Sequence, residues 1–252
     1  MLAVVLGSGI VFLDTSVVNL AQARIVQELD SPIFSFAPLE AQSYIVNGYF
    51  LTLSALLILA GSLADYFGRA RVFRIGLVGF LATSILCGLA PNAELLILFR
   101  ILQGAAGAAV VPGSLAIITA SFEGEKQGRA FGVWAAASAG TTILGPVIGG
   151  AFVNTVSWRA AFLINVPFLL VALYAMRYVP ESRDEEASGR FDWLGSVVAV
   201  LAVAGLAFGT IRGQQENWTA PEAFVALAVG AAALVAFPFL MTRRQNPLVP
   251  PS

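Results

Sequence analysis

Long apolar segments alternate with short polar connections along nearly the whole chain. Eight of these segments have the length of a membrane-spanning helix, about 20 residues. They cover residues 1–23, 42–64, 72–89, 95–120, 128–152, 159–179, 193–211 and 222–241. The connections hold most of the charge and many turn-forming residues. The pattern predicts an all-α membrane protein whose even number of spans places both termini on one side.

Composition supports the bilayer as the solvent. Hydrophobic residues make up 58% of the chain and charged residues 12%, about half the roughly 25% charge of a soluble domain, and the mean hydropathy is +0.83. The net charge of −1 offers no basic face for nucleic acid. A single cysteine, Cys87, and the absence of histidine leave no disulfide framework and only carboxylates for proton chemistry. We therefore expect no metal, no cofactor and no enzymatic centre.

The distribution of basic residues predicts the orientation, because lysine and arginine favour cytoplasmic loops. The connections after the even-numbered spans, with their flanks, carry Arg69, Arg71, Arg74, Lys126, Arg129, Arg177, Arg183, Arg190, Arg243 and Arg244. The opposite side carries Arg24, Arg159 and Arg212. Both termini are thus expected in the cytoplasm, in a multi-pass protein of the cell membrane.

Asp14 is the most unusual residue of the first span, which holds no other charge from Met1 to Leu20. An ionised aspartate at the centre of a span costs about 2.5–3.5 kcal/mol on insertion scales. Such a residue normally faces a protein interior or a wet cavity, has a partner, and serves ion or proton movement. The alternative is an aspartate that only caps a break in the helix.

The connection between the second and third spans combines Gly61, Asp65, Gly68, Arg69 and Arg71. The glycines allow a tight turn at a helix end, Asp65 is expected to accept hydrogen bonds from free helix N–H groups, and the arginines stand on the side where they are favoured. By physical reasoning alone this is also the pattern of a plain cytoplasmic turn.

The fourth span contains Arg100 and Gln103, followed by Gly104. Arg100 lies about five residues from the outer end of the span, roughly 8 Å deep. It either snorkels to the headgroups or pairs with Asp14, if the first and fourth helices meet.

The fifth span ends with Gly145, Pro146, Gly149 and Gly150. Two small residues four apart allow close helix contact, and the proline removes a backbone donor and bends the helix. A packing seam with a proline kink accounts for this pattern without any further role.

Taken together, these motifs resemble those of the major facilitator superfamily. The Gly61-to-Arg71 turn resembles its signature between the second and third spans, with Tyr66 and Ala70 where basic residues are usual. Arg100, Gln103 and Gly104 resemble its fourth-span motif. The segment Gly145-Pro146 with Gly149-Gly150 resembles the motif of its antiporters. The resemblance implies that the first and fourth spans line a central cavity, with Asp14, Asn19, Arg100 and Gln103 as proton-coupling and cavity residues.

Three further segments resemble the branch of fourteen-span drug:proton antiporters. They are residues 13–19 of the first span, residues 158–167 at the start of the sixth, and residues 191–195 before the seventh. In that branch two extra helices lie between two six-helix bundles. The resemblance implies that a proton entering from outside protonates Asp14 and releases the substrate.

The expected organisation is a six-helix bundle (1–179), a cytoplasmic loop (180–192), two linker helices (193–241) and a cytoplasmic exit segment (242–252), with the second bundle missing. The expected function is proton-coupled efflux of small lipophilic or cationic, drug-like compounds. Two alternatives remain open: an importer or uniporter of the same fold, and a non-transporting membrane subunit or remnant half protein.

Overall fold

The computed structural model describes residues 1–183 and 191–242, and all regular secondary structure in these residues is helical. The helices are α1 Leu2–Glu28, α2 Pro38–Phe67, α3 Arg69–Gly88, α4 Ala93–Ser121, α5 Gly124–Thr155, α6 Ala160–Leu163, α7 Asn165–Ala175, the 3₁₀ turn η1 Met176–Tyr178, α8 Trp193–Gln215 and α9 Pro221–Thr242. Most of the predicted loop 180–192 and of the exit segment 242–252, with Arg190, Arg243 and Arg244, lies outside the described residues.

Eight spans are confirmed within the described residues: the helices α1 to α5, the group α6–α7–η1, α8 and α9 are all long and apolar enough to cross a bilayer. Several helices extend beyond the apolar segments that predicted them. The second begins at Pro38, which fits the first helical turn because its missing N–H needs no partner there. The first continues to Glu28, which pairs with Arg24 one turn earlier.

The sixth span is divided where the sequence places Pro167. This residue has no N–H to donate to the carbonyl of Leu163, and its ring would collide with that carbonyl in a regular helix. The helix accordingly ends as α6 at Leu163 and resumes as α7 at Asn165. The interruption makes Asn165 the first residue of a new helix in the middle of the bundle.

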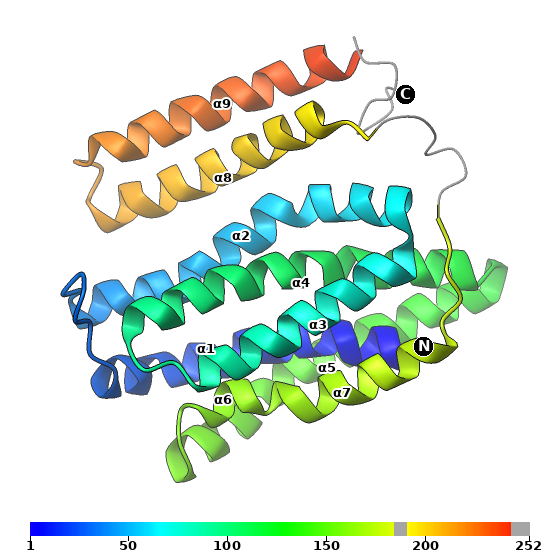
Figure 1. Ribbon diagram of the computed structural model, residues 1–252, viewed down its shortest axis with the longest axis horizontal. Helices are drawn as coiled ribbons and strands as arrows, with labels where there is room; N and C mark the ends of the chain where they lie inside the picture. The colour runs from blue at the N-terminus through cyan, green and yellow to red at the C-terminus, as the bar shows by residue number, and fades with distance from the viewer. Residues whose placement is uncertain (184–190, 243–252) are drawn as a thin grey trace.

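The first six spans form one bundle, and α8 and α9 form a hairpin beside it (Figure 1). The first helix packs against α5, α7, α4 and α2, while α4 also packs closely against α2 and α3. Of the hairpin, α8 lies along α2 and α9 lies along α8. The chain enters α1 and leaves α9 at the same end of the molecule, as an even number of spans requires.

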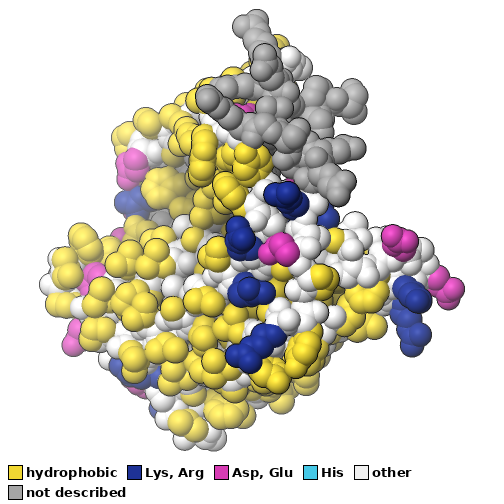
Figure 2. Space-filling model, turned by 45° about the vertical axis from the view of Figure 1, so that its right-hand side comes forward, with side chains coloured by type: hydrophobic (Ala, Val, Ile, Leu, Met, Phe, Trp, Pro, Cys, Tyr) yellow, Lys and Arg dark blue, Asp and Glu magenta, His cyan; other side chains and the backbone are white. Residues whose placement is uncertain are grey.

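We call the end of the bundle that carries the turn between α2 and α3 the turn end. Basic side chains gather there, and Figure 2 shows them on the surface that this end presents. Among the described residues they are Arg69, Arg71, Arg74, Lys126, Arg129, Arg177 and Arg183. The uneven distribution of basic residues that the sequence predicted is therefore present in the folded molecule, at the turn end.

Candidate functional site

Asp14 lies in the middle of α1, wholly buried at 0% exposure. The helix continues unbroken on both sides of it, so the residue does not cap a helix break. Its Oδ2 accepts a hydrogen bond from Nη1 of Arg100 at 2.7 Å. Its Oδ1 accepts from Nδ2 of Asn165 at 2.7 Å and from Nε2 of Gln103 at 3.3 Å. Three donors from two other helices thus hold one carboxylate inside the bundle.

Arg100 is 1% exposed and turns into the bundle, which rules out snorkelling to the membrane surface. Besides Asp14, its Nη1 donates to Oε1 of Gln103 at 2.6 Å, and its Nε donates to the carbonyl of Ile45 in α2 at 3.3 Å. The guanidinium also lies over the ring of Tyr49, 4.1 Å from the ring centroid, where a cation is attracted to the aromatic face. A planar group is needed to make these contacts together, and lysine has none.

The remaining members of this buried polar cluster are Gln103, Ser84 and Asn165. Ser84 of α3 accepts from Nε2 of Gln103 at 2.9 Å and from Nδ2 of Asn165 at 3.3 Å. Ser84, Gln103 and Asn165 are all fully buried. The cluster therefore joins α1, α3, α4 and α7 through side chains that would each be costly to leave unpaired in an apolar medium.

One acceptor in the cluster has no partner: the amide oxygen of Asn165 is buried and unbonded. Both hydrogens of its Nδ2 already have acceptors, Asp14 and Ser84. An unsatisfied buried acceptor costs about 1–3 kcal/mol. The cluster thus contains an unpaired hydrogen-bond acceptor next to the aspartate.

Sequence reasoning identified Asp14, Arg100 and Gln103, and the structure brings these three together. It did not identify Ser84, Asn165 and Tyr49 as members of the site. Asn165 carried a usable signal, since an amide two residues before a proline in an apolar run is a polar group at a helix break. Ser84 carried none, because serine is common in membrane helices. Asn19 is exposed and lies outside the buried cluster.

The fifth helix packs closely on α1 beside the cluster. A Cβ at Gly145 would collide with that of Ser16, and one at Gly149 would lie 2.9 Å from Cγ1 of Val17. A Cβ at Gly150 would meet nothing within 4 Å, and Pro146 is exposed inside a continuous helix. The seam predicted from the sequence therefore consists of Gly145 and Gly149, with Gly150 facing away from it.

The turn between α2 and α3 depends on Gly68, whose φ of +113° is a conformation that residues with a Cβ rarely adopt. Asp65 pairs with Arg69 one helical turn later, at 2.9 Å. It does not accept from the helix N–H groups as expected. That role belongs to Glu181, whose Oε1 accepts from the backbone N–H of Ala70 at 3.0 Å.

Other residues of this turn have fewer contacts. The expected role of Gly61 in the turn is wrong: this residue lies within the unbroken helix α2, and a Cβ there would meet nothing within 4 Å. Arg71 is exposed at the start of α3, and its backbone N–H points to Glu181 at 3.4 Å. Glu181 comes from the segment after the sixth span, so the turn is tied to a part of the chain about 110 residues away. Sequence reasoning missed this contact because nothing local marks it.

Among the described residues, no group of three or more Cys, Asp or Glu side chains is arranged to hold a metal ion. The cluster around Asp14 contains a single carboxylate, two amides, a hydroxyl and a guanidinium. This donor set suits a proton or a polar ligand rather than a divalent cation.

The eight apolar spans of the described residues, with an ion pair buried inside the bundle of the first six, define a multi-pass helical membrane protein. The sequence profile of the Major Facilitator Superfamily matches residues 4–248, and the chain belongs to this superfamily. Its members are transporters and not enzymes. The predicted fold class is confirmed by the family and by the eight helices.

Several relatives at the sequence level are named as resistance proteins. The chain is 36% identical over 251 residues to the "Tetracenomycin C resistance and export protein" of Streptomyces glaucescens, covering 99% of this chain and 46% of that protein. It is 38% identical over 253 residues to the "Multidrug resistance protein Stp" of Mycobacterium tuberculosis, covering 99% of this chain and 45% of that protein. The chain spans about half the length of these relatives.

Solved structures support the fold at low sequence identity. A crystal structure of "peptide transporter POT in complex with sulfate" superposes with a TM-score of 0.63 at 14% identity, over 97% of this chain and 52% of that one. A bacterial homologue of the human lysosomal transporter Spinster, in an inward-facing and unoccupied conformation, gives 0.57 at 19% identity over 95% and 60%.

Proposed function

We propose that this chain forms the first six-helix bundle and two linker helices of a proton-coupled efflux transporter for small lipophilic or cationic, drug-like compounds. The names of the relatives, which are export and resistance proteins, support efflux. The buried Asp14 supports proton coupling, because an ionisable residue inside a membrane bundle ordinarily serves ion or proton movement. This aspartate and its bond to Arg100 carry the proposal.

The coupling follows from the charges of the pair. With Asp14 ionised, its charge and that of Arg100 balance within hydrogen-bond distance. Protonation removes the negative charge and leaves the guanidinium uncompensated in a medium of low dielectric constant. A cationic substrate near the site then meets net positive charge and is expelled. When the proton leaves, the pair reforms and the site accepts a cation again.

Asn165 gives the protonated state a place to donate its hydrogen bond. The acid form of Asp14 is a donor, and Arg100 can offer it no acceptor. Rotation of the Asn165 amide by half a turn would put the unbonded Oδ1 where Nδ2 now lies, 2.7 Å from the carboxylate. The hydroxyl of Ser84 can then donate to the same oxygen. Each orientation leaves one side of the amide without a partner, so neither orientation satisfies all of the amide's hydrogen-bonding groups.

The proposal includes a second bundle. Alternating access in this fold requires two bundles to rock against each other around a site near the midplane, and the described residues supply one bundle and a hairpin. The relatives are about twice as long as this chain, which agrees with a second bundle of similar size. We therefore expect that the 252-residue chain alone does not pump.

The orientation is proposed with both termini in the cytoplasm, because the turn end carries most of the basic residues. The turn residues Gly61, Asp65, Gly68, Arg69 and Arg71 then lie on the cytoplasmic face, where they act as a gate. The motif at Gly145, Pro146, Gly149 and Gly150 lets α5 slide closely along α1 beside the coupling site.

The test uses the complete transporter that contains this chain, in liposomes with an inward proton gradient and a fluorescent cationic drug. Asp14→Asn should abolish proton-driven transport while leaving membrane insertion intact. Asp30→Asn makes the same chemical change at an exposed carboxylate beyond the end of α1 and should transport normally. Transport at the wild-type rate by Asp14→Asn would remove the proposal. Accumulation in the direction of the gradient would favour the importer, and no transport by the wild-type protein would favour a non-transporting subunit.

A further inference from the structure

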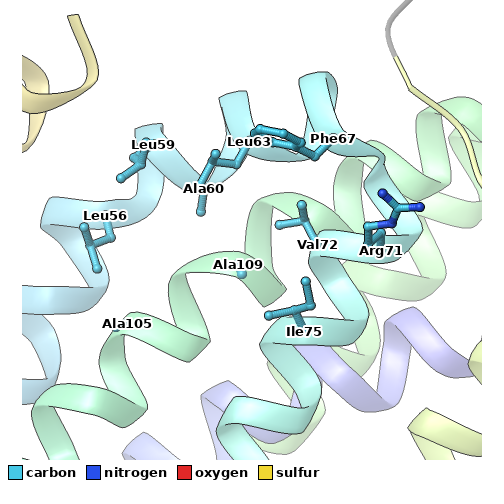
Figure 3. Close-up of a pocket in the computed structure, with 10 residues that line it drawn as sticks. All are labelled: Leu56, Leu59, Ala60, Leu63, Phe67, Arg71, Val72, Ile75, Ala105 and Ala109. Atoms are coloured by element: carbon cyan, nitrogen blue, oxygen red, sulfur yellow. The ribbon is translucent and has the colours of Figure 1, made fainter. Parts of the chain in front are cut away.

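A groove at the turn end lies outside the coupling site. It is a cavity of about 360 Å³ between α2, α3 and α4 (Figure 3). Leu56 and Leu63 of α2 form one wall, Ile75 of α3 forms the other, and Ala109 of α4 forms the floor. Small side chains on the floor leave the space open, and within the described residues its lining is apolar except at one position.

The exception is Arg71, which stands at one end of the groove beside Phe67, while Leu56 and Ala105 mark the opposite end. Arg71 is exposed, and its guanidinium takes part in no ion pair within the part of the chain that the structure describes. The carboxylates nearby are already engaged, Asp65 by Arg69 and Glu181 by backbone N–H groups. Among the residues that the structure describes, the groove therefore ends in a positive charge that has no ion-pair partner.

The dimensions of the groove fit an acyl chain. From Leu56 to Phe67 the helix rises about 16 Å at 1.5 Å per residue, which is close to half of the roughly 30 Å hydrocarbon core, the depth of one leaflet. Its outer wall is open to the surroundings of the bundle, since Ile75 of the lining is 65% exposed and Val78, three residues further along α3, is 51% exposed. The polar end coincides with the end of the spans, where a headgroup lies.

We propose that this groove is a binding site for an anionic phospholipid, with one acyl chain along Leu56, Leu63 and Ile75 and the headgroup phosphate on Arg71. Charge complementarity selects the lipid class: a guanidinium at the end of an apolar channel pairs with phosphate in a charge-assisted, two-pronged contact. A zwitterionic lipid offers the same tail but carries a compensating ammonium group. The site shares Arg71 with the proposed gate but no residue with the buried cluster around Asp14.

The experiment is native mass spectrometry of the purified 252-residue chain in detergent, titrated with phosphatidylglycerol or with phosphatidylcholine of identical acyl chains. The wild-type chain should bind phosphatidylglycerol in preference. Arg71→Gln should reduce that preference about fivefold, the change expected when one basic residue near an anionic surface is lost. Arg74→Gln is the control, because Arg74 is also exposed, three residues further on, but donates to the carbonyl of Met176 at 3.4 Å and does not line the groove.

Two measurements separate the tail from the headgroup. Ala105→Phe should fill the floor of the groove and weaken both lipids, with helix content and elution volume checking that the variant folds. Glycerol 3-phosphate, a headgroup without tails, should not compete with phosphatidylglycerol. Equal losses in Arg71→Gln and Arg74→Gln would show attraction to the basic end only and overturn the site. Competition by glycerol 3-phosphate would also overturn the site. A lipid-free dimer that Ala105→Phe dissociates would overturn it too, because the groove would then belong to the contact with a second copy of the chain.

Discussion

Two carboxylate–guanidinium pairs of nearly equal length lie in opposite surroundings. Arg100 and Asp14 are 2.7 Å apart with side chains 1% and 0% exposed. Arg69 and Asp65 are 2.9 Å apart with side chains 19% and 42% exposed. The inner pair joins residues of two helices that are 86 positions apart in the chain, whereas the outer pair joins residues four apart across the junction of α2 and α3. Equal distances therefore describe interactions of very different strength and use.

The difference comes from what each charge meets when its partner is removed. An exposed guanidinium returns to water, so a surface pair contributes about 0–1 kcal/mol. A buried charge cannot reach water, and losing its partner costs on the order of 3–5 kcal/mol. The inner pair is thus a fixed part of the fold that only protonation relieves. The outer pair can open and close at little cost, which suits the proposed gate.

The largest effect is expected at Arg100. Arg100→Ala leaves Asp14 without its ion-pair partner and removes the guanidinium that packs over Tyr49, so the free energy of unfolding should fall by on the order of 3–5 kcal/mol. Arg100→Lys should recover only part of this loss, because an ammonium cannot reach Asp14, Gln103 and the Ile45 carbonyl together.

The measurement is equilibrium unfolding in mixed micelles with rising sodium dodecyl sulfate, followed by circular dichroism. Arg69→Ala is the control and should lose less than about 1 kcal/mol. If the two alanine variants lost the same amount, burial would not distinguish the two pairs, and the comparison would fail.

The sequence predicted the inner pair better than its surroundings. Asp14 and Arg100 were recognisable because charge is rare in apolar spans, and a rare residue needs a partner. Their companions were not, since Ser84 looks like any small residue of a helix, and the position of Asn165 depends on how Pro167 divides the sixth span. The eight spans were predictable from hydropathy alone, because the bilayer imposes their length.

The turn was predicted in its residues but not in its bonds. The positive φ of Gly68 follows from the residue type. The predicted partner of Asp65 was wrong. Both Asp65 and Glu181 carry a carboxylate that can accept from the first N–H groups of α3, and the sequence does not show which of the two does so. Glu181, which is 111 residues away from Ala70 in the chain, takes this role. Contacts between distant segments depend on the packing of whole helices, and no local pattern encodes them.

A second effect sharpens the contrast between sites inside and outside the packed bundle. Gly145→Ala would place a Cβ in collision with that of Ser16, and overpacking of this kind costs about 1–3 kcal/mol. Gly150→Ala meets open space in the same helix, and there alanine should stabilise by roughly 0.5–1 kcal/mol. The same unfolding titration checks the signs, and a loss in both variants would refute the assigned seam.

A third, smaller effect concerns Glu181 at the turn. Glu181→Ala removes the carboxylate that accepts from the first N–H groups of α3, and the loss of such a cap costs about 0.5–2 kcal/mol. Glu181→Gln retains an acceptor and should lose only the charge–dipole part, about 0.3–1 kcal/mol. Glu123 precedes α5 without making a side-chain cap, so Glu123→Ala should be silent. Thermal midpoints in detergent compare the three variants, and equal midpoints for Glu181→Ala and Glu123→Ala would show that the cap is not formed in the membrane protein.

The smallest effect is the coupling between Asp65 and Arg69, and it decides how a transport defect at the turn is to be understood. A pair one helical turn apart and partly exposed should show a coupling energy of about 0.3–0.5 kcal/mol in a double-mutant cycle with Asp65→Asn and Arg69→Gln. The corresponding cycle with Asp14→Asn and Arg100→Gln should lie near the upper end of the roughly 0.5–3 kcal/mol range for residues in contact. Since the outer pair hardly contributes to stability, any loss of transport in Asp65→Asn must come from gating and not from unfolding. A coupling above about 1 kcal/mol at the turn would instead mean that this pair holds the fold, and a gate would then have to be sought in residues that can part at lower cost.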